Sequence, residues 1–417
     1  MPFSLSRRWV IFFLACFLFV LSQFYRASVA VISPDLIRDL GLDTKGLSLV
    51  SAAFFYAFAV MQIPIAIYLD RIGPRITMSV LTLVAVAGAL LFAIGESLAA
   101  LTVGRALLGL GMACNLMGTL KLITLWFGPL RFATLASLVV SVGTAGNIAA
   151  ATPLVVMVGA LGWRTTFLVF AAINFLLAVL FFLVVRDRPE PASGATESPK
   201  ASTRPEKLLA GVRALFAEKD YWIISFGTFC RYGIFAAVQA LWAGPYLMKV
   251  LGVSPVTAGN LLFLMSIGII VGSPMCGWLS DIVIGSRKKV VIFGLLGMLA
   301  VLVVFARLDA GVGFLPLAVL FFGFGFFASP GQIMYAHIKE RMPIELAGTA
   351  MTGINFFTMT GVAVFLQGLG SAMQRFYPEA SLGAGAFRGA FYFCAGCLLV
   401  TALLYLLTRE TRRRKPR

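Results

Sequence analysis

Charged side chains are scarce in this sequence, and histidine occurs once. Of its 417 residues, 12% are charged and 60% are hydrophobic, and the mean hydropathy is +0.95. A water-soluble domain carries about 25% charged residues, so this composition excludes a soluble protein. At roughly 20 residues for each crossing of a bilayer, the hydrophobic residues are enough for about twelve helices. We therefore expect an all-α integral membrane protein.

Acidic side chains are absent from the interior of the hydrophobic runs, because all 17 fall in polar segments or at the ends of the runs. The sequence also lacks a Gly-Lys-Ser/Thr phosphate loop, a nucleophile elbow, a paired carboxylate site and zinc-ligand spacing. We therefore expect no ATP-driven transport, no enzymatic activity, no cofactor and no metal. The six cysteines lie in apolar runs and are interpreted as buried thiols.

The 34 lysines and arginines are unevenly distributed. With the spans given below, 23 lie on the side of the two termini, seven lie on the opposite side, and four (Arg26, Arg105, Lys121 and Arg231) fall inside spans. Basic residues favour the cytoplasmic side of a membrane, so we expect both termini in the cytoplasm, in a bacterial inner membrane. This distribution accounts for the net charge of +17 without a nucleic-acid partner.

The hydrophobic runs form two groups of six. We predict spans at 9–33, 46–69, 76–94, 98–126, 132–158, 165–185, 220–248, 256–280, 290–307, 312–338, 347–374 and 385–408. Residues 186–219 are rich in Pro, Ser and charge, which is typical of a flexible linker. The chain therefore divides into an N-terminal six-helix bundle (1–185), a cytoplasmic linker (186–219) and a C-terminal six-helix bundle with a basic cytoplasmic tail (220–417).

Matching residues in the two groups indicate a duplication. Arg26 matches Arg231 at an offset of 205 residues, Asp70 matches Asp281 at 211, and Pro129 matches Pro343 at 214. Because each half has an even number of spans, the repeats share one orientation and are related by a pseudo-two-fold axis along the membrane normal. Two such halves can rock about a central site.

Two arginines, Arg26 and Arg231, lie well inside predicted spans, where a charge is costly unless it faces water or a partner. If they face each other across the axis, they form a two-fork site for a carboxylate or phosphate group. The alternative is that each is a structural pin, bonded to helix carbonyls or to a carboxylate such as Asp35.

Other polar residues follow the same helix faces or lie in neighbouring spans. The candidates for shaping the rest of a substrate site are Tyr25, Tyr232, Gln62, Gln239, Trp242 and Asn355. Lys121 either lines the cavity or extends to the membrane interface, and Arg105 is interpreted as a helix-packing or coupling residue. His337 and Asp35 are the candidates for proton coupling, although a locally bonded histidine is the alternative for His337.

The turn after the second span, Asp70-Arg71-Ile72-Gly73-Pro74-Arg75, resembles the major facilitator superfamily signature Gly-x-x-x-Asp-Arg-x-Gly-Arg-Lys/Arg, with Ala66 in place of the first glycine. A second copy, Gly277-Trp278-Leu279-Ser280-Asp281, precedes Arg287, Lys288 and Lys289. The resemblance implies that Asp70, Arg71, Arg75 and Asp281 form a cytoplasmic latch that opens and closes as the halves rock.

Within that superfamily the chain resembles the organophosphate and organic-anion permeases. Arg26 and Arg231 match the two arginines that bind the anion in those proteins, and His337 with the segment after it resembles their connection between spans 10 and 11. Gln62 stands where the glycerol-phosphate carriers have a cavity lysine, and Gly146 stands where they have a cavity histidine. These departures point away from exchange of phosphate for an organophosphate.

The sequence thus predicts a monomeric secondary transporter of a small organic anion, a phosphate ester or a carboxylate, that works by rocker-switch alternating access. A proton or a counter-anion would drive the cycle, and the lipid bilayer is the surrounding partner. Two alternatives stay open. One is an efflux transporter of amphipathic compounds, suggested by 15 Met and 37 Phe residues. The other is a transporter-like membrane sensor.

Overall fold

The computed structural model describes residues 3–127, 132–187, 216–342 and 347–410, and all regular elements in these ranges are helices. The first half contains α1 (Phe3–Ala27), α2 (Val29–Leu40), α3 (Thr44–Arg71), α4 (Pro74–Ile94), α5 (Leu98–Met112), α6 (Asn115–Phe127), α7 (Phe132–Ala149), α8 (Thr152–Leu161) and α9 (Trp163–Val184). The predicted linker falls largely on 188–215, and Pro129, Arg131 and Pro343 also lie outside the described residues.

The second half begins with α11 (Lys219–Ala237), which continues without a break through the π-helix η2 (Val238–Trp242), α12 (Ala243–Pro245) and the π-helix η3 (Tyr246–Val250). It then contains α13 (Pro255–Trp278), the π-helix η4 (Leu279–Val283), α14 (Arg287–Phe305), α15 (Phe314–Ala328), α16 (Gly331–Arg341), α17 (Ala347–Phe376) and α18 (Ala384–Tyr405). Eleven helices in the described residues are long and apolar enough to cross a membrane, and α7 with α8, bent by 40°, makes a twelfth if the pair is one span.

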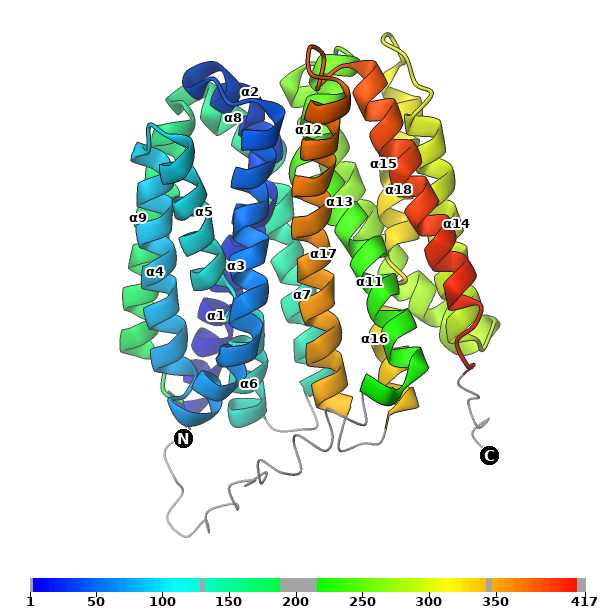
Figure 1. The fold of residues 1–417 in the computed structure, drawn as a ribbon. Coiled ribbons are helices and arrows are strands. Elements are labelled where there is room, and N and C mark those ends of the chain that lie inside the picture. Colours follow the sequence, from blue (N-terminus) through cyan, green and yellow to red (C-terminus); the bar gives the residue numbers. More distant parts are fainter. Residues whose placement is uncertain (1–2, 128–131, 188–215, 343–346, 411–417) are drawn as a thin grey trace.

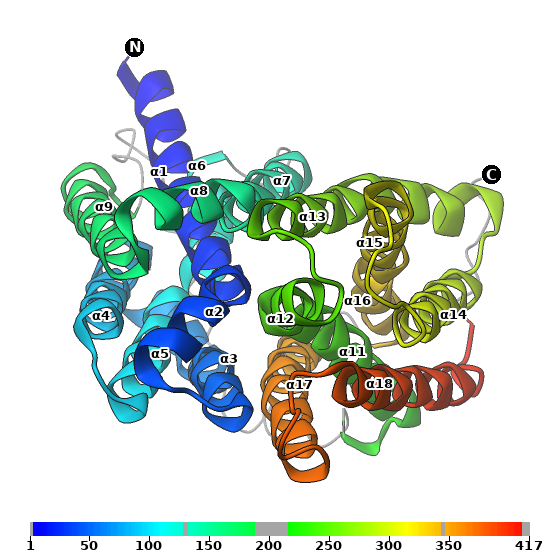
Figure 2. The same cartoon turned by 90° about the horizontal axis from the view of Figure 1, so that it is seen from above.

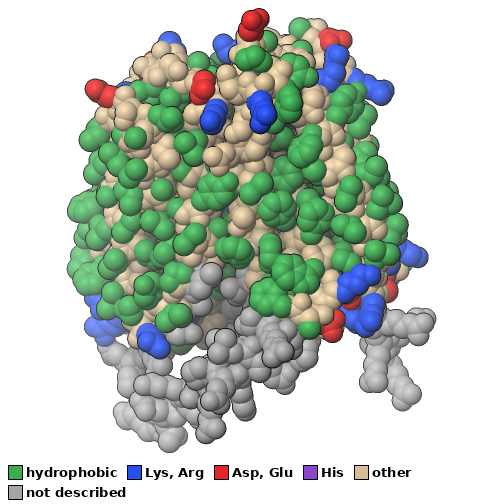
Figure 3. Space-filling view, in the orientation of Figure 1, with side chains coloured by type: hydrophobic (Ala, Val, Ile, Leu, Met, Phe, Trp, Pro, Cys, Tyr) green, Lys and Arg blue, Asp and Glu red, His purple; other side chains and the backbone are tan. Residues whose placement is uncertain are grey.

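The helices form two bundles that stand side by side (Figures 1 and 2). Hydrophobic side chains cover the visible flank of the molecule, and charged side chains gather at its two ends (Figure 3). We call the end at which α1 begins and α18 ends the terminal side, and the opposite end the far side. The predicted all-helical fold is confirmed.

The two halves share helix caps and turn glycines at equivalent positions. Asp43 accepts a hydrogen bond from the backbone of Gly46 at the start of α3, and Ser254 does the same for Thr257 at the start of α13. Such capping groups satisfy backbone N–H groups that the helix leaves unpaired. Glycines with positive φ also recur before helices, at Gly41 (61°) and Gly252 (69°). The offset of 211 residues in both pairs fits the predicted duplication.

Four predicted spans are broken in the structure, at Ser28, at residues 113–114, at residues 150–151 and at residues 329–330. Pro153 and Pro330 lie at two of these breaks, and proline lacks the N–H that would continue the helix. The breaks leave backbone carbonyls free of helical partners in the middle of the bundles, where buried polar side chains can bond to them.

Candidate functional site

A pocket lies between the two halves, close to the break between α1 and α2. It is lined by Gln23, Arg26 and Ala27 from α1, Phe55 from α3, Asn147 from α7, Tyr232 and Ala236 from α11, and Gln239 and Ala240 from η2. Three predicted substrate residues, Arg26, Tyr232 and Gln239, therefore meet in one place. The volume open to water-sized molecules is about 20 Å³, which is room for about one water.

Arg26 occupies the last turn of α1, where the negative end of the helix dipole favours a cation. Its guanidinium lies over the ring of Phe58 from α3, with 4.3 Å between the guanidinium carbon and the ring centre. The hydroxyl of Tyr232 faces Arg26 from the opposite half. The buried Nε has no hydrogen-bond partner among the described residues. No carboxylate lines the pocket in the described part of the chain.

Arg231 is buried, and its guanidinium turns into the second half. One Nη donates to the carbonyl of Ala328, the last residue of α15, while Nε has no partner among the described residues. A Cβ at Gly331 would lie 2.0 Å from the other Nη, so only glycine leaves room for this arginine beside the start of α16. In this structure Arg231 therefore bonds to a helix end, as the pin alternative requires.

The two arginines lie at different heights in the bundle. The break in the first repeat, at Ser28, matches the start of η2 at Val238, which is 210 residues later. By this register Arg26 corresponds to Ala236, and Ala236 lines the same pocket. Arg231 precedes Ala236 by five residues, about 7.5 Å along the helix toward the terminal side. The expected symmetric pair is therefore an offset pair.

Gln62 and Asn355 form a hydrogen bond between the halves on the terminal side of the pocket. The Nδ2 of Asn355 in α17 donates to the Oε1 of Gln62 in α3 at 2.9 Å. The hydroxyl of Tyr335 lies 3.3 Å from the Oδ1 of Asn355 and 3.1 Å from the hydroxyl of Thr358. This polar network joins α3 to α16 and α17, so both predicted residues lie at the interface between the halves rather than in the pocket lining.

Three other predicted residues point elsewhere. Tyr25 is buried against Phe167 of α9, because it lies on the opposite side of α1 from the pocket. Trp242 packs on Phe387 of α18, since the π-helix changes the spacing on which its prediction rested. Lys121 donates to the carbonyl of Leu69 near the terminal end of α3, and so it does not line the pocket.

Arg105 bonds to the first half only, as expected for a packing residue. It is fully buried, donates to the carbonyl of Tyr25 at 2.7 Å and lies over the ring of Phe54 at 4.8 Å. This bond ties α5 to the last turn of α1, next to Arg26.

The two candidates for proton coupling lie away from the pocket. His337 is buried on the terminal side, where Nε2 must donate to the carbonyl of Arg409 at 3.0 Å, so Nδ1 accepts from the hydroxyl of Tyr405 at 2.8 Å. Asp35 forms an ion pair with Arg38 at 2.8 Å on the far side. His337 is therefore a locally bonded histidine, and Asp35 pairs with Arg38 rather than with Arg26.

Two of the residues predicted to form the latch, Arg75 and Asp281, have bonds described within their own halves. Arg75, in the first turn of α4, donates its backbone N–H to Asp187 at 2.7 Å and its Nε to the carbonyl of Phe182 at 2.8 Å. Asp281 pairs with Arg287 at the start of α14, and Arg287 also binds Glu340 at 2.9 Å. Arg71 is exposed, and the side chain of Asp70 lies outside the described part of the chain.

Asn147 is a pocket residue that the sequence did not reveal. It lies in α7 next to Gly146, where a Cβ would come within 2.0 Å of the Val20 carbonyl of α1. The glycine lets the two helices approach closely, so the next residue reaches the pocket. The sequence feature that could have revealed it is the pair Gly146-Asn147. A glycine lets two helices approach closely, and the residue next to it then lies beside that contact.

Comparisons with known proteins agree with this architecture. The sequence model of the Major Facilitator Superfamily matches residues 12–364 and 224–417. The "Probable hexose phosphate transport protein" of Chlamydia muridarum is 24% identical over 424 residues, which cover 95% of this chain and 90% of that protein. The hexuronate transporter of Bacillus subtilis is 25% identical over 396 residues, which cover 92% of this chain and 90% of that protein.

Among solved structures, an inward-facing, unoccupied bacterial homologue of the human lysosomal transporter Spinster has a TM-score of 0.76. Its sequence is 17% identical, and the match covers 96% of both chains, so this likeness concerns the fold. The resemblance read from the sequence to this superfamily and its organic-anion branch is confirmed.

Proposed function

The chain belongs to the Major Facilitator Superfamily, and on that premise we propose that it carries a small organic anion, a carboxylate or a phosphate ester, by alternating access. Family membership makes it a membrane transporter and not an enzyme. The relatives described above are named for hexose phosphates and hexuronates, and both groups of compounds are organic anions.

The observation that carries the proposal is the Arg26 guanidinium in the pocket between the halves. Its Nε is buried without a partner among the described residues, and the described pocket lining has no carboxylate. A guanidinium within a membrane protein is costly unless an opposite charge or water faces it. A bound anion supplies that charge, and its two oxygens match the planar fork of an arginine.

Arg231 is the second cation of the proposed site. It lies one to two helical turns from Arg26. The hydrogen bond described above joins one Nη of Arg231 to the carbonyl of Ala328, which is a neutral partner. An anion is a stronger partner than a carbonyl, so Arg231 leaves Ala328 when substrate binds. Tyr232, Gln239 and Asn147 supply the hydroxyl and amide groups that bind the neutral part of the substrate.

The proposed cycle requires the halves to separate, because the pocket has room for about one water and both halves line it. A molecule the size of a hexuronate enters only after a rocking motion has opened one side. The far side is bridged by two hydrogen bonds at 2.6 Å, between Thr152 and Asn260 and between Thr44 and Ser381, and the terminal side by the bond between Gln62 and Asn355. The terminal side faces the cytoplasm by its excess of basic residues, and the turns at Arg75 and Asp281 act there as the latch.

Ligand-dependent thermal stability of the purified protein tests this proposal. Binding to the folded state alone adds about 2.7 kcal/mol of stability at a ligand concentration of 100 times Kd. We expect one class of anion, among phosphate esters, carboxylates and inorganic anions, to raise the melting temperature. Arg26→Gln should abolish the rise, and Arg26→Lys should retain part of it because the charge remains. Arg38→Gln is the matched control, since Arg38 lies outside the pocket on the far side.

Two results would overturn the proposal. One is the absence of any shift with every anion in protein that melts cooperatively, which would favour efflux of amphipathic compounds or a sensor. The other is an anion shift that survives in Arg26→Gln, which would place the binding site elsewhere in the molecule.

A further inference from the structure

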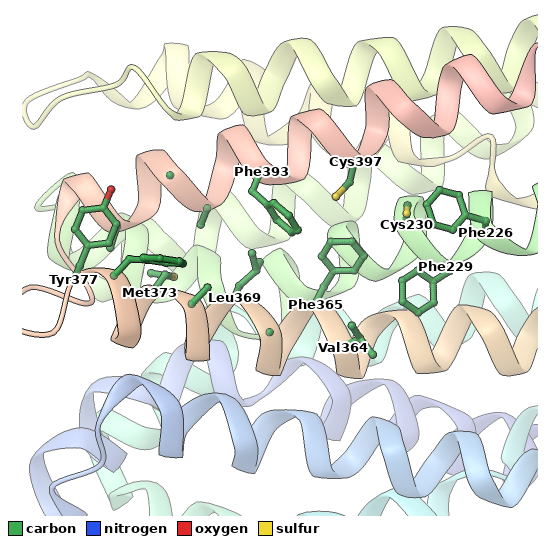
Figure 4. Close-up of a pocket in the computed structure, with 16 residues that line it drawn as sticks. Phe226, Phe229, Cys230, Val364, Phe365, Leu369, Met373, Tyr377, Phe393 and Cys397 are labelled. Carbon is green, nitrogen blue, oxygen red and sulfur yellow. The ribbon is translucent and has the colours of Figure 1, made fainter.

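A second, much larger cavity lies within the second half, away from the pocket between the halves. It is a groove of about 750 Å³ between α11, α17 and α18 (Figure 4). Its lining is hydrophobic, with Phe229, Phe365, Leu369, Met373 and Phe393 among the side chains that enclose it. An anion has no favourable partner on these walls, so the groove does not suit the anion proposed for the pocket between the halves.

The groove opens toward the bilayer. Phe393 is 60% exposed and Phe376 is 73% exposed, whereas Leu369, Met373 and Cys230 at its base are buried. Exposed apolar side chains around a buried apolar base form a surface that a hydrocarbon can enter from the side. The helices that form it are candidate membrane spans, so lipid tails are the hydrocarbon at hand.

The groove is long enough to span one leaflet. Its lining on α17 runs from Val364 to Phe376, thirteen residues or about 20 Å of helix. Because α17 covers Ala347–Phe376 and ends on the far side, these residues extend from near its middle to its far end. Half of a hydrocarbon core of about 30 Å is about 15 Å, which one extended acyl chain fills.

The far mouth of the groove carries the groups expected at a lipid headgroup. Tyr377 lies there, and tyrosine prefers the membrane–water interface. Arg375 lies two residues before Tyr377, is exposed, and makes no hydrogen bond or ion pair in the described residues. A cation next to an apolar groove fits an anionic phospholipid.

From these observations we propose that the groove between α11, α17 and α18 binds one acyl chain of a phospholipid of the far leaflet, with its anionic headgroup at Arg375. This site is separate from the proposed transport site, and it does not depend on the identity of the transported anion.

The test is photolabelling in phosphatidylglycerol vesicles that contain a phosphatidylglycerol with a diazirine on its acyl chain, followed by mapping of the labelled peptides. In the unmodified protein, we expect residues 364–377 and 386–397 to be labelled severalfold more than the exposed face of α15 around Val319. Gly368→Leu puts a side chain into the groove from an open position, because a Cβ at Gly368 meets no atom within 4 Å. This variant should lose the excess labelling.

Gly396→Leu is the matched control, because Gly396 is also open and exposed but does not line the groove. It should leave the labelling unchanged. In the unmodified protein, the phosphatidylglycerol probe should label the groove more than the same probe with a phosphatidylcholine headgroup does, and Arg375→Gln should reduce this difference. Equal labelling of the groove and of α15 in the unmodified protein would overturn the proposal, because it would mean that lipid contacts the groove no more specifically than the rest of the surface. The same conclusion follows if Gly368→Leu, shown to melt like the unmodified protein, retains the excess.

Discussion

Two of the side-chain hydrogen bonds that join the halves in the described residues, one on each side of the pocket, should have opposite effects on the access state of the transporter; a third, between Thr44 and Ser381, lies on the far side. Gln62 and Asn355 meet on the terminal side, whereas Thr152 and Asn260 meet on the far side. Removing the first bond with Gln62→Ala should favour the state that is open on the terminal side. Removing the second with Asn260→Ala should favour the state that is open on the far side.

The size of the effect follows from the chemistry of the two contacts. Each is a hydrogen bond between neutral groups, at 2.9 Å and 2.6 Å. Such a bond contributes a net of about 1 kcal/mol, which changes the ratio of two states by about fivefold. Because the residues lie far apart in the structure and share no hydrogen-bond partner, the effects should add in the double variant, and the ratio should return close to that of the unmodified protein.

Distances between spin labels in a cysteine-free background measure the ratio. A label pair at Arg71 and Lys339 reports on the terminal side, and a pair at Lys45 and Glu379 reports on the far side, since all four residues are exposed. Gln62→Ala should increase the population with a long terminal-side distance, and Asn260→Ala the population with a long far-side distance.

The reasoning is refuted if both single variants shift the population toward the same side, or if neither changes it. A common shift would mean that the two contacts do not close opposite sides. No shift would mean that they persist in both states, which would exclude them as gates.

Three further predictions concern packing and charge. Gly146→Ala should destabilise the protein by about 1–3 kcal/mol through overpacking of α1 against α7, whereas Gly159→Ala, at an open position, should be neutral in thermal melting. Gly331→Ala should displace Arg231 from the carbonyl of Ala328 and lower the melting temperature, because a hydrogen bond from a charged group contributes about 1.5–3 kcal/mol. An unchanged melting temperature would contradict this prediction. Hydrogen bonds from Trp163 and Arg38 hold the pKa of Asp39 below its ordinary value of 3.8. The ionised carboxylate therefore stabilises the fold above pH 3.8, and this contribution is lost as the pH falls through the pKa of Asp39 in the folded protein. Melting temperature measured against pH should show that acid-dependent loss, and Asp39→Asn should remove it.

The membrane class and the number of spans follow from composition, because a bilayer imposes one simple rule on every crossing segment. An apolar run of about 20 residues must be helical to satisfy its backbone, whatever surrounds it. The sequence alone therefore locates helices such as α4 and α18 to within a few residues. Repeated turns such as Asp70-Arg71 and Asp281 then identify the family.

The orientation of individual side chains could not be predicted from the sequence. Tyr25 and Arg26 were both candidate site residues because they are adjacent polar residues inside one span, but only the rotation of α1 against its neighbours placed Arg26 in the pocket and Tyr25 against Phe167. The π-helix η2 likewise moved Trp242 out of the stripe that α-helical periodicity assigned to it. Neither the rotation of a packed helix nor a one-residue change in its pitch is encoded in polarity alone.

The sequence by itself determined that Arg26 and Arg231 lie inside the membrane without acidic partners in the spans, since that depends only on residue type and position along a run. The tertiary structure decided which of the two faces the gap between the halves. Arg26 lies in the pocket, whereas Arg231 bonds to the carbonyl of Ala328, because the helix break at Pro330 and the missing side chain at Gly331 create a place for its guanidinium. That place depends on the packing of α11 against α15 and α16, segments about one hundred residues apart in the chain.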